Sequence, residues 1–331
     1  MKNAYIKNIS FYVPDKIITN DDLSKLMDTS DEWIQTRTGI KQRHSVGEKC
    51  LGPADLAVKA AEKVIKKSKI DKSDIDFVVF ATSTPDYYVP GSGSIFQDKL
   101  GLDNIGVLDI RQGCSGFTYA LTVANQFIKS GTHENILVVG AEVQTTQLDF
   151  DNAGRGTAVL FGDGAAACLL SGTTDNRGIL SSHLHSDGKY ITELGTEYPS
   201  SKYKDIITVE KVKERKHHIH MNGREVFKHA VRRFPQVILE GLEYNDLTID
   251  DVKLVIPHQA NLRITQTVQK QLGVPDNKIF SNIHKYGNTT AASIGIALSE
   301  ALEEGKIQKG DIIVLASFGA GWYWGSVIIK W

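Results

Sequence analysis

Short apolar runs alternate along the chain with longer stretches of helical periodicity. Continuous apolar runs occupy residues 77–81, 136–140, 158–161, 254–257 and 312–316, and a further largely apolar, strand-like stretch occupies residues 105–110. Runs of this length are typical of strands that are buried on both faces of a largely parallel sheet. Helices are predicted over residues 53–68, 116–130, 226–239, 261–272 and 290–304, with Gly or Pro near several of their ends. The alternation predicts an α/β protein.

A faint internal repeat accompanies this alternation. Residues 73–80 resemble residues 249–256, and each segment is followed at similar distance by a small-residue turn that opens a helix. The first turn holds Cys114 and the second holds Asn288. Two related α/β halves, residues 1–175 and 176–331, would bring these turns to a shared interface. The alternative is a chance similarity between two ordinary α/β units.

Length, charge and cysteine content narrow the class of protein. A chain of 331 residues exceeds the usual size of a single core, which favours two subdomains. The formal net charge of −1 gives no reason to expect binding to nucleic acid or to an anionic membrane. No apolar run is long enough to span a membrane, and the start lacks the apolar stretch of a signal peptide. The three cysteines are widely spaced, which argues against a disulfide framework or a zinc site and favours a reducing cytoplasm.

Residues 185–220 differ from the rest of the chain. This stretch is polar, contains Pro199 and ends in a run rich in Lys and His. We expect a long surface excursion of the second half, and such excursions are often functional lids. The basic run is either a solvated face or a binding surface.

Cys114 lies at a predicted strand-to-helix turn between Gly113 and Gly116. Free N–H groups at a helix N-terminus favour an anion, so this position is expected to lower the thiol pKa and to stabilise a thiolate. The glycines permit a tight turn and close approach of a ligand. The local sequence leaves two interpretations open: a nucleophile, or a small buried core residue.

Two further polar residues follow predicted strands. His258 comes directly after the strand at 254–257, and Asn288 occupies a glycine turn that opens a helix. Either residue alone is usually structural, but with Cys114 they predict a site at one edge of the sheet. The order Cys, His, Asn also occurs in papain-like proteases. The flanking sequence of that family is absent and the α/β pattern disagrees, so this alternative is disfavoured.

Longer motifs carry a resemblance to a known family. They are residues 28–44, Cys114-Ser-Gly-Phe, Phe161-Gly-Asp-Gly-Ala, residues 221–228, His258-Gln-Ala-Asn-Leu-Arg-Ile, Tyr286-Gly-Asn-Thr-Thr-Ala-Ala-Ser and Ser317-Phe-Gly-Ala-Gly. In this order the motifs resemble β-ketoacyl-ACP synthase III, over about residues 5–331. The resemblance implies the thiolase fold, an α/β architecture in which two pseudo-symmetric halves form five layers, α-β-α-β-α, usually in a homodimer.

The resemblance also implies a catalytic set. Cys114 would accept an acyl group from a CoA thioester, and malonyl-ACP would then lose CO2 and form an enolate. His258 and Asn288 would donate hydrogen bonds to the enolate oxygen. The oxyanion formed during acyl transfer would be held by backbone N–H groups of Cys114 and of an active-site loop, residues Phe318, Gly319, Ala320 and Gly321.

Binding roles are implied in the same way. The residues expected to contact CoA are Trp33, Arg37, Arg155, Arg224 and Asn261. A basic patch for acyl carrier protein would comprise Lys228, Arg263 and Lys270. The acyl pocket would include Trp322, and Val89 stands where some family members place a Phe that reaches into the acyl pocket of the partner subunit. The alternatives are a core aromatic residue at Trp33 and ordinary solvated charges for the patch. No metal and no cofactor are expected, because the substrates are the acyl-CoA and malonyl-ACP.

The predicted function is therefore initiation of fatty-acid biosynthesis by a cytoplasmic acyltransferase, with acetyl-CoA as the expected primer. The alternative is a related condensing or acyl-transfer enzyme of secondary metabolism, of polyketide, quinolone or resorcinol type, with a longer or different primer. A third hypothesis is a non-catalytic thiolase-fold subunit that binds acyl carriers. The intact set of Cys114, His258 and Asn288 disfavours that hypothesis, because a scaffold needs none of the three.

Overall fold

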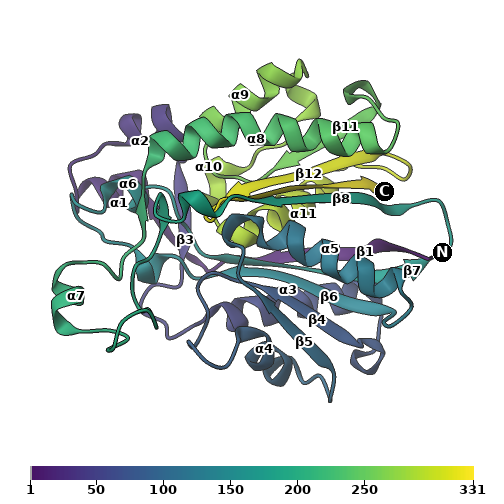
Figure 1. Cartoon of the computed structure of the whole chain (residues 1–331), viewed down its shortest axis with the longest axis horizontal. Helices are drawn as coiled ribbons and strands as arrows, with labels where there is room; N and C mark the ends of the chain where they lie inside the picture. The colour runs from purple at the N-terminus through teal and green to yellow at the C-terminus, as the bar shows by residue number, and fades with distance from the viewer. Residues whose placement is uncertain (1) are drawn as a thin grey trace.

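Two mixed β-sheets form the centre of the molecule in the computed structural model, which describes residues 2–331 (Figure 1). The first sheet has the strand order β1-β7-β6-β4-β5, and its strands are β1 (Asn3–Tyr12), β7 (Gly164–Thr173), β6 (Asn135–Glu142), β4 (Phe77–Ala81) and β5 (Gly106–Ile110). The second has the order β11-β12-β13-β8, with β11 (Val252–Pro257), β12 (Ile312–Gly319), β13 (Tyr323–Lys330) and β8 (Gly178–Ser186). The first sheet thus draws all its strands from residues 3–173 and the second from residues 178–330.

Both sheets have the same pattern of strand directions. In the first sheet β4 pairs in parallel with β6, and β7 runs antiparallel to both β6 and β1. In the second sheet β11 pairs in parallel with β12, and β13 runs antiparallel to both β12 and β8. Where the first sheet has β5, the second has a single parallel bridge between Val255 and Ile279. The repeat suggested by the sequence is therefore present in the structure.

Helices complete a five-layered architecture. α5 (Gly116–Lys129) and α11 (Ser293–Glu303) lie between the two sheets, and their apolar faces share one core with both (Figure 1). α3 (Pro53–Ser68) and α4 (Ser92–Leu100) cover the outer face of the first sheet, and α8 (Gly223–Tyr244) and α9 (Leu262–Leu272) cover that of the second. The predicted thiolase fold is confirmed.

Local sequence explains why these helices start and stop where they do. α3 has Pro53 at its first position, where the missing N–H costs nothing, and its buried residues recur on one face while its lysines face outward. α9 starts at the side chain of Asn261, which accepts a hydrogen bond from the Arg263 N–H, and it ends at Gly273 in the left-handed conformation. The predicted bounds of these helices therefore agree closely with the observed ones.

The remaining elements gather at the left end of the molecule in Figure 1. They are β2 (Lys16–Thr19) paired with β3 (Gln42–Ser45), β9 (Leu194–Gly195) paired with β10 (His220–Met221), and the helices α1 (Asn20–Ser24), α2 (Asp31–Thr38), α6 (Arg155–Ala158), α7 (Val209–Lys213) and α10 (Ile283–Tyr286). Two 3-10 turns, Gly113–Ser115 and Thr290–Ala292, precede α5 and α11. Both turns therefore lie at the start of a helix of the middle layer.

One predicted strand is wrong. Residues 158–161 are the end of α6 and the turn that follows it. Val159, Leu160 and Phe161 are buried because they pack in a separate cluster with Ile34 of α2. Burial on all sides, without a neighbouring strand, produced the apolar run that suggested a strand.

The excursion at 185–220 contains β9, α7 and β10. α7 protrudes from the body of the molecule (Figure 1). The basic end of the excursion is held to the surface by ion pairs of Arg215 with Asp149 at 3.1 Å and with Asp151. The first part of the excursion instead packs inward, where Leu194 is buried. No helix within residues 2–331 is long and apolar enough to cross a membrane.

Candidate active site

Three connected cavities lead from the surface past Cys114. An outer cleft of about 400 Å³ is lined by Trp33, Arg37, Arg224, Asn261 and Arg263 among others. It shares Leu160, Met221, Gly223, Phe227 and Asn261 with a narrower passage of about 110 Å³. That passage shares Cys114, Phe161 and Leu194 with an inner cavity of about 260 Å³. The thiol thus lies where the middle passage meets the inner cavity, which is partly open to solvent beside Arg111, Ile191 and Thr196.

Cys114, His258 and Asn288 all line the middle passage. Each side chain comes from the turn that follows a buried strand or opens a middle-layer helix, so the two halves of the fold contribute to one site. The structure therefore brings together the three residues that the sequence singled out as catalytic.

Cys114 is held in close contact with Gly319. The thiol is buried, and it occupies the 3-10 turn before α5, where Gly113 has a φ of 49°. A Cβ added at Gly319 would lie 2.6 Å from Cys114 Cβ and 3.0 Å from its Sγ. Only glycine leaves room for the sulfur at this position.

Burial controls the protonation of Cys114. It raises the pKa of the thiol to about 12, and the nearby carboxylate of Glu142 contributes in the same direction. The backbone N–H groups of Cys114 and Ala320 act in the opposite direction but are outweighed. The expectation that the helix N-terminus lowers this pKa is therefore wrong, because removal from water destabilises the thiolate by more free energy than the nearby N–H groups stabilise it.

The N–H groups of Cys114 and Ala320 both interact with the sulfur. Phe318 lines the middle passage with Gly319, while Ala320 and Gly321 line the inner cavity. The predicted active-site loop thus lies beside the Cys114 thiol, and the loop residues nearest the thiol, Gly319 and Ala320, are small. Two converging backbone donors are the usual composition of an oxyanion hole.

His258 is buried beyond β11 with one ring nitrogen paired and one unpaired. Its Nδ1 lies 2.6 Å from Ser293 Oγ, at the start of α11. Its Nε2 has no hydrogen-bond partner within residues 2–331. Burial lowers the pKa of His258 to about 3, so the ring is neutral at physiological pH.

The amide of Asn288 is oriented by its own turn. Its Oδ1 accepts a hydrogen bond from the Thr290 N–H at 2.9 Å, which directs the Nδ2 donors away from the backbone. The backbone of Asn288 donates to the Leu160 carbonyl and accepts from Gly162. At Gly287, with a φ of 65°, a Cβ would lie 2.7 Å from the Leu160 carbonyl oxygen, so glycine is required there too. The turn therefore fixes a neutral donor beside a neutral imidazole.

Trp33 lies between two guanidinium groups at the outer cleft. The centre of its ring is 4.7 Å from Arg37 and 5.1 Å from Arg155, both cation–π distances. Arg155 also donates to the Asp28 carbonyl at 2.5 Å. Trp33 is partly buried against a small apolar cluster, so it combines a core contact with an accessible ring.

Of the other predicted binding residues, Asn261, Arg224 and Arg263 line the same opening. Asn261 caps α9 and donates to the Arg37 carbonyl at 3.0 Å, so it joins α9 to α2 while lining both outer cavities. Arg224 and Arg263 are exposed at the outer cleft. Lys228 and Lys270 are also exposed, and Lys228 pairs with Glu225 at 3.2 Å. The cleft therefore has a predominantly cationic rim.

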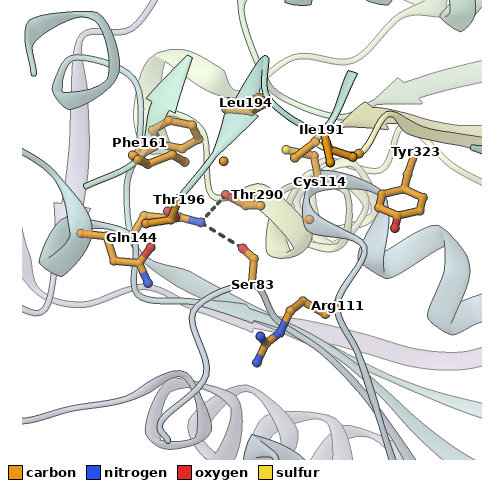
Figure 2. A pocket seen from close by; sticks show the side chains of 16 residues that line it. Ser83, Arg111, Cys114, Gln144, Phe161, Ile191, Leu194, Thr196, Thr290 and Tyr323 are labelled. Atoms are coloured by element: carbon orange, nitrogen blue, oxygen red, sulfur yellow. Dashed lines mark hydrogen bonds between the residues drawn. The ribbon is translucent and has the colours of Figure 1, made fainter. Parts of the chain in front are cut away.

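Two predicted residues of the acyl pocket do not line any of these cavities. Val89 is 78% exposed on the loop between β4 and α4. Trp322 is buried, but its ring packs behind the loop against Phe318 and Tyr190. The inner cavity is lined instead by residues such as Ser83, Arg111, Gln144, Ile191, Leu194 and Thr196 (Figure 2).

Sequence reasoning missed Ser293, Gln144 and this inner wall. Ser293 closes the motif that starts at Tyr286, but nothing in one sequence pairs it with His258. Gln144 follows a predicted strand and carried no distinguishing signal. Within the described part of the chain, no group of three or more His, Cys, Asp or Glu residues gathers as a metal site. The three cysteines are all free.

The chain is similar to known proteins over its whole length. Residues 108–188 match the family described as 3-oxoacyl-[acyl-carrier-protein (ACP)] synthase III, and residues 242–331 match the C-terminal part of that description. A protein from Fusobacterium nucleatum named beta-ketoacyl-[acyl-carrier-protein] synthase III is 43% identical over 331 residues, covering 100% of this chain and 99% of the relative. The chain belongs to the β-ketoacyl-ACP synthase III family.

Further members of the β-ketoacyl-ACP synthase III family agree. A Clostridioides difficile protein of the same name is 44% identical over 328 residues, covering 99% of this chain and 98% of the relative. The crystal structure of 3-oxoacyl-[acyl-carrier-protein] synthase III from Aquifex aeolicus has a TM-score of 0.90 at 38% identity and covers 100% of both chains. The protein is thus a condensing enzyme of the acyltransferase type, which supports the predicted function over the alternative in secondary metabolism.

Proposed function

We propose that the protein catalyses a decarboxylating Claisen condensation between an acyl-CoA primer and malonyl-ACP, through an acyl group on Cys114. The observation that carries this proposal is the convergence of a buried thiol, a neutral imidazole and an oriented amide on one passage. Hydrolysis at this buried site would need a general base to activate water. Neither Asn288 nor a histidine with a pKa of about 3 is suited to that role, so the residues favour condensation over hydrolysis.

In the first half-reaction the Cys114 sulfur attacks the thioester carbonyl of the primer. A new S–C bond forms, the bond to the CoA sulfur breaks, and the proton of the Cys114 thiol leaves with CoA. The carbonyl oxygen becomes negative in the transition state, where the N–H groups of Cys114 and Ala320 would stabilise it. One such donor typically contributes about 3 kcal/mol to lowering the barrier.

In the second half-reaction malonyl-ACP binds in the middle passage and loses CO2. The electron pair of the broken C–C bond moves into an enolate, whose oxygen accepts hydrogen bonds from His258 Nε2 and Asn288 Nδ2. The enolate carbon then attacks the acyl group, and the Cys114 thiolate leaves. Neutral donors suit this step, because a charged partner would hold the enolate as a stable ion pair.

The outer cleft supports a role in CoA binding. Trp33, Arg37 and Arg155 offer an aromatic face and cations to an adenine nucleotide, with Arg224 beside them. Asn261 lies where the pantetheine arm would pass toward Cys114. The exposed cations Lys228, Arg263 and Lys270 would receive the acidic acyl carrier protein in a transient, salt-sensitive contact.

We also propose a cytoplasmic homodimer in which each chain consists of halves 1–175 and 176–331. β5 is an edge strand, so its outer hydrogen-bonding groups have no strand to pair with in one chain. Leu108 of β5 and the nearby Tyr87, Tyr88 and Val89 are exposed apolar side chains. Pairing of two β5 strands would cover this surface.

The direct test is intact-mass analysis of the protein after incubation with acetyl-CoA. One acetyl group should be added to the wild type and none to Cys114→Ala. Cys168→Ala is the matched control, since Cys168 is also a free buried thiol but lies in β7, away from the cavities. Absence of an adduct on the wild type, or its persistence in Cys114→Ala, would overturn the proposal.

A second measurement separates the two half-reactions. His258→Ala and Asn288→Ala should still accept the acetyl group but should release CO2 from malonyl-ACP at least 100-fold more slowly, in line with the loss of one preorganised donor. Unchanged CO2 release from either variant would contradict the enolate role.

A further inference from the structure

The inner cavity beyond Cys114 has a polar wall. Ser83, Gln144, Thr196, Thr290 and Tyr323 place hydrogen-bonding groups around a volume of about 260 Å³ (Figure 2). One water molecule occupies roughly 30 Å³ in the liquid, so the cavity has room for more than a two-carbon acetyl group. The apolar residues Phe161, Leu194 and Ile219 also line the cavity. An acyl chain on Cys114 would therefore meet both apolar and polar side chains.

Gln144 is the residue of this wall with an unmet hydrogen bond. Its side chain is 2% exposed, and Figure 2 shows its amide nitrogen directed at Ser83 and Thr290. The Nε2 group donates to Thr290 Oγ1 at 2.9 Å, to Ser83 Oγ at 3.3 Å and to Glu142 Oε2 at 3.4 Å. The carbonyl oxygen Oε1 has no partner among residues 2–331.

The orientation of this amide is fixed by Glu142. The Glu142 carboxyl oxygens accept hydrogen bonds from the Ser83 N–H and from the hydroxyls of Ser83 and Thr84. Turning the amide round would place Gln144 Oε1 against these acceptors. The network therefore fixes Nε2 as the donor to neighbouring protein groups and leaves Gln144 Oε1 as a buried acceptor without a donor. An unpaired buried acceptor is unfavourable until a donor reaches it.

The geometry points to a primer acyl group that carries a hydroxyl, with Gln144 Oε1 accepting the hydrogen bond from that hydroxyl. This inference rests on the proposed function, since it assigns the acyl group held by Cys114. A plain hydrocarbon chain would leave Oε1 unpaired, so a hydroxylated chain of the same length is favoured. Arg111 also lines the cavity and would attract a carboxylate, but at Gln144 Oε1 a carboxylate would bring negative charge toward that oxygen and the neighbouring Glu142, so it is disfavoured at this position.

The test compares acyl-CoA primers of matched length on the full-length enzyme. Butyryl-CoA, each enantiomer of 3-hydroxybutyryl-CoA, and succinyl-CoA are supplied separately, and the rate of Cys114 acylation is followed by intact mass. One enantiomer of the hydroxyacyl primer should react about tenfold faster than butyryl-CoA, as expected for one buried neutral hydrogen bond. Equal rates would overturn the inference and would mean that water satisfies Gln144.

The Gln144→Leu variant removes the acceptor at similar size, and its ratio of the two rates should fall to about one. Gln147→Leu is the matched control, because Gln147 lines the same cavity but is only half-buried and has no unpaired buried oxygen; it should keep the wild-type ratio. A ratio that survives in Gln144→Leu, or a preference for succinyl-CoA, would overturn the assignment to Gln144. Should Gln144→Leu fail to fold, the ratio in the wild type and in Gln144→Met still decides.

This outcome is distinguishable from failure of the proposed function. If acetyl-CoA acylates Cys114 and the hydroxyl has no effect, only the inference about the inner cavity fails. If no acyl-CoA acylates Cys114, the proposed function fails first.

Discussion

Ser293 Oγ lies 2.6 Å from Nδ1 of His258 and 3.4 Å from the backbone nitrogen of Gln259, which donates to it. The Ser293 hydroxyl can accept from Gln259 and still donate its own proton to Nδ1, which is the direction that the proposed enolate role of His258 requires. That arrangement leaves the proton of the neutral ring on Nε2, where it faces the passage. We therefore expect Ser293 to be a positioning residue that favours the Nε2-protonated form of His258, the form that the proposed function requires.

Removing this hydroxyl should affect the second half-reaction only. In Ser293→Ala, CO2 release from malonyl-ACP should fall about tenfold, because Nδ1 loses its buried partner and the tautomer is no longer fixed. Acylation by acetyl-CoA should keep its rate, which separates this role from general damage. Ser299→Ala is the control, since Ser299 is also buried in α11 but its hydroxyl has no partner within the described chain. Equal loss in both half-reactions would contradict the role.

Gly319→Ala should abolish acylation of Cys114. The added Cβ would lie 3.0 Å from Sγ and 2.6 Å from Cys114 Cβ, both shorter than ordinary contacts, so the thiol must move from the Ala320 N–H. We expect a loss of at least 100-fold, comparable to removal of an oxyanion donor. Gly188→Ala, where a Cβ meets nothing within 4 Å, is the matched control. Acetyl transfer at the wild-type rate in Gly319→Ala would contradict this prediction, because it would show that the loop moves to accommodate the added Cβ without slowing acylation of Cys114.

The pH dependence of stability should report the burial of His258. Its pKa is lowered from 6.5 to about 3, so below pH 6.5 the unfolded chain binds a proton that the folded protein does not. Folding stability from this group is therefore complete above pH 6.5 and decreases as the pH falls toward 3. At pH 5 the loss amounts to about 2 kcal/mol.

Urea unfolding at pH 7.5 and pH 5.0 measures this effect. The wild type should lose more stability between the two values than His258→Gln, which has no proton to gain. Other groups titrate in both proteins, so the difference between them isolates His258. Identical losses would mean that the folded protein admits the protonated ring.

Alkylation of Cys114 should be slow and should lack a plateau. With a pKa of about 12, only a small fraction of the thiol is ionised at neutral pH, so the rate with iodoacetamide should rise about tenfold per pH unit between 7 and 9. Peptide mass spectrometry can follow Cys114 and the exposed Cys50 in the same sample. A plateau for Cys114 below pH 9 would indicate that the fold stabilises the thiolate after all.

Trp33→Ala should weaken the use of CoA substrates in particular. Loss of the ring between Arg37 and Arg155 removes the aromatic face of the outer cleft, so KM for acetyl-CoA should rise about tenfold. The acetyl thioester of N-acetylcysteamine has no nucleotide, and its KM should not change. Trp331→Ala, at the opposite end of the molecule in Figure 1, should alter neither value. An equal rise in KM for both thioesters in Trp33→Ala would show that Trp33 has a structural role and does not bind the nucleotide.

Much of the fold could be predicted from sequence, because buried parallel strands and amphipathic helices leave clear patterns. β4, β6, β11 and β12 contain the apolar runs predicted at residues 77–81, 136–140, 254–257 and 312–316. The prediction at 158–161 was wrong because a turn buried on all sides has the same composition as a strand. The cleft between the two halves depends on contacts between segments far apart in the chain, and a single sequence does not contain them.

The candidate site divides in the same way. Cys114, His258 and Asn288 stand in distinctive turns, and those turns meet as expected. The pKa of Cys114 could not be predicted, since it depends on how completely the surrounding fold excludes water and on Glu142 from a different strand. Ser293 contacts His258, and Gln144 contacts Ser83 and Thr290; these partners are distant in the chain, and such contacts have no signature in the local sequence.

The middle layer gives the chemistry an unusual dependence on how the two halves sit together. α5 follows the Cys114 thiol, while α11 follows Asn288, the proposed enolate donor, and supplies Ser293, the partner of His258. A Cβ at Gly295 of α11 would lie 2.4 Å from Ala166 of the first sheet and 3.1 Å from Phe117 of α5, so the two halves meet with no spare space. A shift of about 0.5 Å of α11 relative to α5 and the first sheet would leave every strand intact and would still misalign the reacting atoms. The catalytic rate should therefore be more sensitive than the secondary structure to a change in the relative position of the two halves.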